Sequence, residues 1–139
     1  DYKRLAKELY IDDITHWLGF INQEDAAKEW ANMDIALIPS TLESESFGVS
    51  AVEAQACGTA VIISDIPGLM EATKPGETSV VVKRKNVISL SKAIVSLYED
   101  STKRNQMAKN GRDFVEKQYD LDKCFTQIEG VFDRFIDNL

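Results

Sequence analysis

Short apolar runs alternate with longer amphipathic stretches along this chain. Residues 35–38, 60–63 and 79–82 are apolar with little polar interruption, which is typical of strands covered on both faces of a sheet. A similar run at 14–18 predicts one more strand, which Gly19 would end. Because helical segments separate these runs, the order predicts an α/β domain with a parallel sheet and right-handed crossovers.

Apolar side chains at three- and four-residue spacing predict helices over most of the remaining sequence. Asn22 is the expected N-cap of the second helix, with Asp25 three residues further on. Gly58 is expected to stop the helix that precedes it. Residues 65–68 and 74–76 carry turn signals. The predicted helices cover residues 1–10, the segment after Asn22, 47–57, 86–98, 101 to about 118 with Ser101 as cap, and 120 onwards with Asp120 at its start.

The most informative stretch is the polar loop and helix start that follow the 35–38 run. Sites in parallel α/β sheets form at the carboxyl ends of the strands, where a helix begins. The backbone N–H groups of Phe47, Gly48 and Val49 would stand at such a helix start, which suits a phosphate. Glu53 lies about two turns along, and its carboxylate could accept hydrogen bonds from a pair of ribose hydroxyls.

Each of these residues also has a simpler structural interpretation. Glu53 falls in a polar stripe with Ser46 and Ser50, as on any amphipathic helix, but the rest of this helix is apolar, as in a buried element. Phe47 fits a core position, and its backbone N–H would still be available. Glu45, eight positions before Glu53, lies in a very polar loop, where a solvated carboxylate is the simpler interpretation.

The stretch around these residues resembles the glycosyltransferases of family 4, which have the GT-B fold. Their motif is a glutamate, seven residues and a second glutamate, followed by Ala-x-Ala-x-Gly-x-x-Val. Here Glu45 and Glu53 have that spacing, and residues 54–61 read Ala-Gln-Ala-Cys-Gly-Thr-Ala-Val. The resemblance covers nearly the full chain, with flanking segments at 17–20, 34–40, 65–71, 99–100 and 110–112 before Tyr119.

The resemblance implies a retaining glycosyltransferase, of hexosyltransferase type, that takes a nucleotide-diphosphate sugar as its donor. It implies that Glu53 binds the ribose hydroxyls and that Glu45 is the catalytic candidate, near the donor sugar and its leaving phosphate. It implies no metal and no other cofactor. The sequence agrees in having no His, Cys or Asp cluster with the spacing of metal ligands.

The resemblance also implies that residues 1–139 form one partial domain. This would be the later part of a C-terminal donor-binding domain, with a Rossmann-like, three-layer fold that ends in helices. The family's sheet has two central strands for which this sequence offers no candidate, because it begins at the helix after them. We therefore expect the family's phosphate-binding Arg and Lys and its acceptor-binding N-terminal domain to lie outside this chain. The isolated chain is expected to be inactive.

The composition indicates which binding partners and which cell compartment to expect. The net charge of −7 argues against nucleic-acid binding. No apolar run approaches the roughly 20 residues that span a bilayer, so membrane association is expected only through an absent part. Cys57 and Cys124 are expected to be reduced thiols, which favours a cytoplasmic protein. His16, the sole histidine, is expected to be structural rather than catalytic.

Other functions stay open at this stage. The main alternative is a non-catalytic nucleotide-binding or interaction module derived from a glycosyltransferase, which would bind a nucleotide without turnover. A receiver-like or flavodoxin-like signalling domain would need an acidic cluster with a phosphorylatable Asp at its first strand end. A nucleotide-sugar epimerase would need a catalytic pair or a cofactor motif. The sequence has no sign of either feature.

Overall fold

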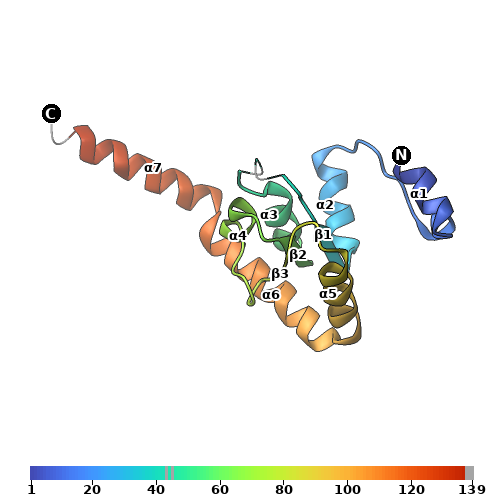
Figure 1. Ribbon diagram of the computed structural model, residues 1–139. Helices are drawn as coiled ribbons and strands as arrows, with labels where there is room; N and C mark the ends of the chain where they lie inside the picture. Colours follow the sequence, from blue (N-terminus) through green and yellow to red (C-terminus); the bar gives the residue numbers. More distant parts are fainter. Residues whose placement is uncertain (43, 45, 137–139) are drawn as a thin grey trace.

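A small parallel sheet lies at the centre of the molecule (Figure 1). The computed structural model describes residues 1–42, 44 and 46–136. The strands are ordered β1-β2-β3, with Ile35 paired to Ala60 and Val61 paired to Ser79. The elements in chain order are α1 (Tyr2–Glu8), the 3-10 helix η1 (Asp12–Ile14), α2 (Gln23–Asn32), β1 (Ile35–Ile38), α3 (Val49–Ala56), β2 (Ala60–Ser64), α4 (Pro67–Glu71), β3 (Ser79–Val82), α5 (Val87–Glu99), α6 (Ser101–Gln118) and α7 (Leu121–Ile136).

The predicted fold class is confirmed. Three of the predicted strands form the parallel sheet, and a helix lies in each crossover, α3 between β1 and β2 and α4 between β2 and β3. The chain ends in the expected helices α5, α6 and α7. The alternating sequence pattern indicated the layered α/β order, and the family resemblance implied its Rossmann-like form.

The predicted strand at 14–18 is wrong. The structure has the short helix η1 at its start and an extended backbone at Thr15 (φ −104°, ψ 119°), but the segment pairs with none of the strands β1 to β3. A strand exists only where its backbone hydrogen-bonds to a neighbour, and an apolar run does not supply that neighbour. The apolar side chains here are exposed instead, Ile14 to 73% and Trp17 to 47%.

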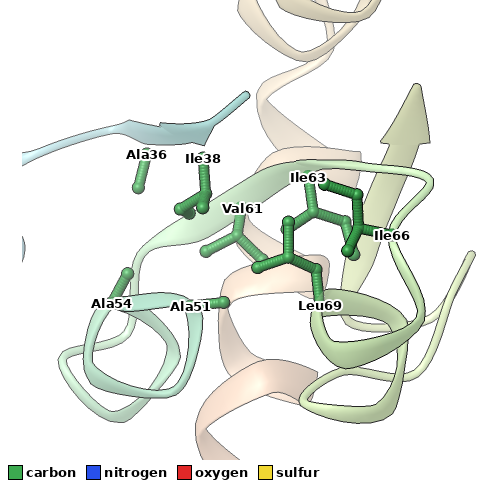
Figure 2. Close-up of a cluster of buried hydrophobic side chains, with 8 residues drawn as sticks. All are labelled: Ala36, Ile38, Ala51, Ala54, Val61, Ile63, Ile66 and Leu69. Atoms are coloured by element: carbon green, nitrogen blue, oxygen red, sulfur yellow. The ribbon is translucent and has the colours of Figure 1, made fainter. Parts of the chain in front are cut away.

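Strand β2 separates two apolar cores because its side chains point alternately to the two faces of the sheet. Val61 and Ile63 belong to the core under α3 and α4, shown in Figure 2. Ala60 and Ile62 belong to the opposite core, against α5 and α6. All five residues of β2 are buried, so the predicted strand with both faces covered is confirmed here.

Gln55 joins the helices on the side of the sheet that carries α3. Its side chain is fully buried, and its Nε2 donates to the carbonyl oxygens of Ala51 (3.0 Å) and Ala72 (3.1 Å). Gly111 of α6 packs against it, since a Cβ at Gly111 would lie 3.0 Å from Gln55 Cγ. The buried amide thus ties α3 to the end of α4, with α6 packed over both.

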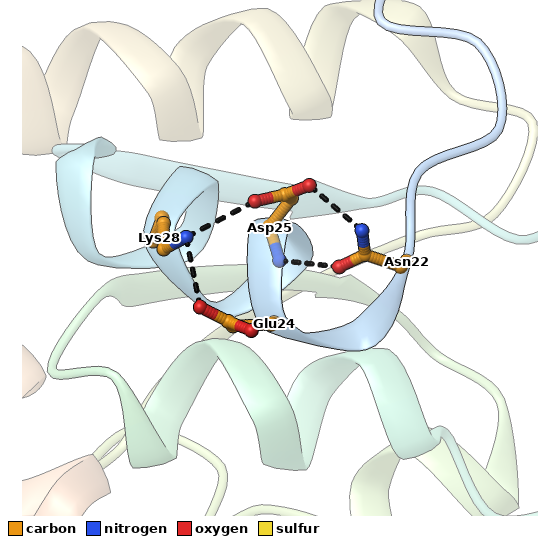
Figure 3. A network of polar contacts seen from close by, with 4 residues as sticks. All are labelled: Asn22, Glu24, Asp25 and Lys28. Atoms are coloured by element: carbon orange, nitrogen blue, oxygen red, sulfur yellow. Dashed lines mark hydrogen bonds and ion pairs between the residues drawn. The ribbon is translucent and has the colours of Figure 1, made fainter.

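Helix α2 begins as its sequence predicts. The Asn22 Oδ1 accepts a hydrogen bond from the Asp25 N–H at 2.9 Å, and the Asn22 Nδ2 donates to the Asp25 carboxylate at 2.8 Å. Figure 3 shows this cap, with Lys28 bridging Asp25 and Glu24 on the next turn. The cap satisfies one of the N–H groups that a helix start leaves without a partner.

Other helix boundaries differ from the predictions. Helix α3 begins at Val49 rather than at residue 47, because Gly48 has a left-handed backbone that a helix cannot continue through. Helix α6 is capped by Asp100 rather than Ser101, and the Asp100 Oδ1 accepts from the Lys103 N–H. The expected turn at 65–68 contains the start of α4, for which Pro67 is already set in a helical φ. The expected Gly58 stop of α3 is confirmed.

Helices α1 and α7 lie away from the sheet at opposite ends of the molecule (Figure 1). Helix α7 has no buried residue, and Phe132 and Phe135 are 63% and 72% exposed. Within the part of the chain that the structure describes, none of the helices combines the length and apolarity needed to cross a bilayer.

Candidate functional site

Gly48 forms the turn that leads from the polar loop into α3. Its backbone is left-handed (φ 74°, ψ 49°), a conformation that glycine adopts without steric cost. A Cβ at this position would lie 2.5 Å from Leu69 Cδ2, so the turn rests directly on α4. The prediction for Gly48 concerned its backbone N–H as a donor to a phosphate. The structure gives two reasons for a glycine, which are the positive φ and the contact with Leu69.

The first turn of α3 presents backbone N–H groups at the end of the sheet where β1 finishes. The carbonyl of Gly48 accepts hydrogen bonds from the N–H groups of Ala51 (2.9 Å) and Val52 (3.3 Å). The N–H groups that precede these in a helix have no partner within the helix. Because α3 begins at Val49, the donors expected at Phe47, Gly48 and Val49 are joined by the N–H of Ser50.

Glu53 lies one helical turn after Val49 and therefore on the same side of α3. It is half-buried and borders an open pocket of about 190 Å³ between α2 and α3. The polar stripe suggested by the sequence is divided, since Ser50 is exposed while Glu53 faces this pocket. The lining is otherwise mainly apolar, with Gln23, Ala26, Ala27, Trp30, Ala56 and Cys57.

Two neighbours of Glu53 have unusual environments. Burial raises the pKa of the Cys57 thiol, the charge of the Glu53 carboxylate raises that pKa further, and Arg112 lowers it. Trp30 Nε1 is buried and has no hydrogen-bond partner within the part of the chain that the structure describes. The four-residue spacing of Glu53 and Cys57 on one helix could have indicated the first feature. The second depends on how α2 packs in the fold, which a local pattern does not show.

The ring of Phe47 contacts Tyr119, the residue that follows α6. The two rings meet edge-on, with centroids 5.5 Å apart and planes at 89°. Tyr119 meets Phe114 in the same way at 5.8 Å, and its hydroxyl donates to the carbonyl of Glu71 at 3.4 Å. Burial and then the Glu71 carboxylate raise the pKa of Tyr119, so the hydroxyl keeps the proton that it donates. Phe47 is 36% exposed, so it only partly fills the core position proposed from the sequence.

The carboxyl ends of β2 and β3 are held together by Asp65. Its Oδ1 accepts a hydrogen bond from the Arg84 N–H at 2.7 Å, and the Arg84 Nε lies 4.0 Å from the same oxygen. Lys83 and Lys85 are exposed and solvated. They border a second pocket, of about 180 Å³, on the α5 side of the sheet, for which the sequence pattern gave no indication.

The remaining candidate, Glu45, and two residues of the 65–71 segment are placed as follows. Glu45 lies outside the described residues, so its predicted role stays a prediction. Gly68 is buried in the first turn of α4, and Glu71 is exposed at the end of that helix. Among the described residues, no group of three His, Cys, Asp or Glu side chains is placed to hold a metal ion.

Comparison with known proteins identifies the family. Residues 1–114 match the family model described as "Glycosyl transferases group 1", which covers most of the chain. The chain therefore belongs to this family of glycosyltransferases, and the resemblance proposed from the sequence is confirmed.

Similar curated proteins include two bacterial glycosyltransferases. One is the N,N'-diacetylbacillosaminyl-diphospho-undecaprenol alpha-1,3-N-acetylgalactosaminyltransferase of Campylobacter jejuni, 36% identical over 124 residues. The other is the D-inositol 3-phosphate glycosyltransferase of Corynebacterium kroppenstedtii, 34% identical over 117 residues. The matches cover 89% and 84% of this chain but 32% and 26% of the relatives, so the chain spans about a third of their length or less.

Solved structures of longer proteins contain the same fold. Sucrose-phosphate synthase from Thermosynechococcus elongatus matches 99% of this chain with a TM-score of 0.88 and 28% identity. Anabaena HepE, solved in complex with UDP, matches 96% with a TM-score of 0.89 and 24% identity, which shows the fold alone. The chain covers 34% and 36% of these proteins. Both are GT-B enzymes, and the Rossmann-like layers described above are therefore those of the GT-B fold.

Proposed function

We propose that this chain forms part of the donor site of a retaining glycosyltransferase that uses a nucleotide-diphosphate sugar. One observation carries the proposal: the open N-terminus of α3, at the end of β1, lies one helical turn from the half-buried carboxylate of Glu53. A phosphate binds to helix N–H groups, and a ribose to a carboxylate. The two groups therefore match the two polar parts of a nucleotide. Membership of the glycosyltransferase family supports this assignment.

Glu53 would hold the ribose hydroxyls in this proposal. Glu53 is half-buried beside the pocket between α2 and α3, so its charge is partly shielded from water. Hydrogen bonds to a charged acceptor are stronger than those between neutral groups, and partial burial strengthens them further. A ribose offers two adjacent hydroxyls, which suits the two oxygens of one carboxylate.

The turn at Phe47, Gly48 and Val49 would bind the diphosphate through its backbone N–H groups. The helix dipole adds a partial positive charge at the same point. Local donors are necessary because the chain as a whole has a net charge of −7, which repels an anion. The family's Arg and Lys, proposed to lie outside this chain, would supply the remaining positive charge as the diphosphate leaves.

Glu45 is proposed to act at the sugar, either on a hydroxyl or on positive charge that develops at the reacting carbon. This role rests on its spacing from Glu53 and on the family motif. The mechanism proposed for this domain needs neither a metal nor a general base from the chain. The acceptor would bind to the N-terminal portion of the whole protein, and the isolated chain would be inactive for lack of it. We place the whole protein in the cytoplasm, where nucleotide sugars and reduced thiols coexist.

A calorimetric titration of the whole protein that contains this chain tests the proposal. UDP is the first nucleotide to use, since HepE was solved with UDP and with UDP-glucose, and GDP and ADP follow. Glu53→Ala removes two charge-assisted hydrogen bonds and should weaken the binding free energy of the preferred nucleotide by about 2–4 kcal/mol. Glu99→Ala is the matched control, because Glu99 is an exposed carboxylate at the end of α5.

Two results would count against the proposal. Equal affinity in the unaltered protein and a folded Glu53→Ala variant would remove Glu53 from the site. Absence of binding by all three nucleotides would remove the donor site altogether. Binding without sugar transfer or donor hydrolysis would instead favour the non-catalytic nucleotide-binding module.

A further inference from the structure

Tyr119 stands at the corner between α6 and α7 and is fixed there from three sides. Its backbone N–H donates to the carbonyl of Val115 at 2.8 Å, which closes the last turn of α6. Its ring meets the ring of Phe114, and its hydroxyl donates to the carbonyl of Glu71 at the end of α4. Lys74 Nζ lies 5.5 Å from the centre of the Phe114 ring. The ring of Tyr119 is therefore held in place by contacts with α6 and with the end of α4.

The ring of Phe47 rests on the ring of Tyr119, 72 positions away in the sequence. Edge-on aromatic pairs at this distance are attractive beyond the apolar area that they bury. The described residues shortly before Phe47, which are Thr41, Leu42, Ser44 and Ser46, are exposed. The contact with Tyr119 is therefore an important support for Phe47 among the described residues.

The two halves of the proposed phosphate-binding turn are thus held by different elements. Gly48 is held by α4, because its Cα has no room for a side chain beside Leu69. Phe47, the residue before it, is held by Tyr119 at the α6–α7 corner. Since φ at Gly48 is positive and glycine is the most permissive residue, the direction of the chain before Gly48 depends on what holds Phe47.

We propose that Tyr119 is a positioning residue for diphosphate binding, acting through the ring of Phe47 on the backbone N–H groups of the turn before α3. The proposal rests on the function proposed above for that turn. Tyr119 itself is not assigned a contact with the donor. Its removal would let Phe47 and its backbone N–H move, while Gly48 stays packed on Leu69 and Glu53, on the next turn of α3, keeps its place. Diphosphate binding and nucleoside binding should therefore respond differently.

The experiment compares UDP with uridine as ligands of the whole protein, by calorimetry with competition for the weaker ligand. If GDP or ADP proves the preferred nucleotide, that nucleotide and its nucleoside replace them. Tyr119→Leu should lower the affinity for UDP about 3- to 10-fold, the effect of one aromatic pair, and leave the affinity for uridine unchanged. Tyr119→Phe keeps the ring and should restore UDP binding. Tyr98→Leu is the matched control, since Tyr98 is 76% exposed on α5.

Phe47→Leu removes the same contact from the other partner, without altering the α6–α7 corner. It should reproduce the selective loss of UDP affinity, and it serves as the deciding variant if Tyr119→Leu does not fold. Equal loss of UDP and uridine, or no loss of UDP in folded Tyr119→Leu and Phe47→Leu, would overturn the positioning role alone. Failure of the unaltered protein to bind any nucleotide would overturn the proposed function and this inference together.

Discussion

The N-termini of α2, α5 and α6 are closed by their own side chains, whereas that of α3 is open. Asn22, Asn86 and Asp100 each accept a hydrogen bond from the backbone N–H three residues on, at 2.8–2.9 Å. Gly48, the N-cap of α3, has no side chain with which to do so. Helix α4 also lacks a side-chain cap, but it has five residues, and Pro67 removes one of its donors.

The difference shows which helix start keeps backbone N–H groups for a ligand. At a capped helix start, one backbone N–H group already donates to a side chain of the protein, and such caps stabilise the fold. The start of α3 forgoes that stabilisation, and its turn is held instead by packing on Leu69 and Tyr119. Its N–H groups are thus placed without being used, which is what binding an anion requires.

The largest expected effect comes from a side chain at Gly48. Gly48→Val places a β-branched residue at positive φ and drives its Cβ into Leu69. We expect a loss of about 3 kcal/mol in the free energy of unfolding, measured by urea denaturation. Gly130→Ala is the control, because a Cβ there meets nothing within 4 Å and a helix favours alanine. A Gly48 variant as stable as the Gly130 variant would contradict the described turn.

Removal of a cap should have a smaller effect, confined to stability. Asn22→Ala leaves the first turn of α2 without its side-chain acceptor and should cost about 1 kcal/mol in the free energy of unfolding. Asn22→Ser keeps an acceptor without placing a second carboxylate beside Asp25, and it should retain most of the stability. If Asn22→Ala were neutral in urea denaturation, the contrast between capped and open helix starts would lose its energetic basis.

The reactivity of Cys57 reports the charge of Glu53. Because burial and Glu53 raise the pKa of the thiol, less thiolate is present near neutral pH, and alkylation should rise at a higher pH than for an exposed cysteine. Glu53→Gln removes the charge, lowers the pKa of Cys57 and should speed alkylation at neutral pH, while burial still keeps the pKa of the thiol raised. The measurement uses a Cys124→Ser background and iodoacetamide. An unchanged alkylation rate in Glu53→Gln would contradict the effect of the Glu53 carboxylate on the pKa of Cys57.

The smallest expected effect is that of the ion pairs on the first turns of α2. Lys28 bridges Glu24 at 3.0 Å and Asp25 at 3.1 Å, but all three side chains are more than half exposed. Lys28→Ala should change the free energy of unfolding by about 0.5 kcal/mol or less, and less still in high salt. A loss larger than that of Asn22→Ala would mean that charge, rather than the cap, holds this helix start.

Local features of the fold were predictable from the sequence, and long-range ones were not. The strands β1 to β3, the Asn22 cap and the Gly58 stop follow from periodicity and from residue types that act on their neighbours in the chain. The segment 14–18 has a strand-like pattern, but a strand also needs a partner, which a local pattern cannot supply. The prediction therefore failed there.

The candidate site divides in the same way. The sequence located the loop, the helix start and Glu53, because motif spacing is local. It did not show that Leu69 lies beside Gly48 or that Tyr119 supports Phe47, since these contacts join segments 21 and 72 positions apart. Their only trace in the sequence was the family resemblance around Tyr119, which carried no indication of a contact.

The central claim is that the open N-terminus of α3 binds the diphosphate while the capped helix starts do not. Two-dimensional NMR of the labelled protein during a titration with UDP tests it most directly. The account predicts that the amide signals of Gly48, Val49 and Ser50 shift at saturating UDP, while those of Val87 and Ser101 at the starts of α5 and α6 do not. Shifts at those capped helices, or unmoved signals at α3 in a protein that binds UDP, would contradict it.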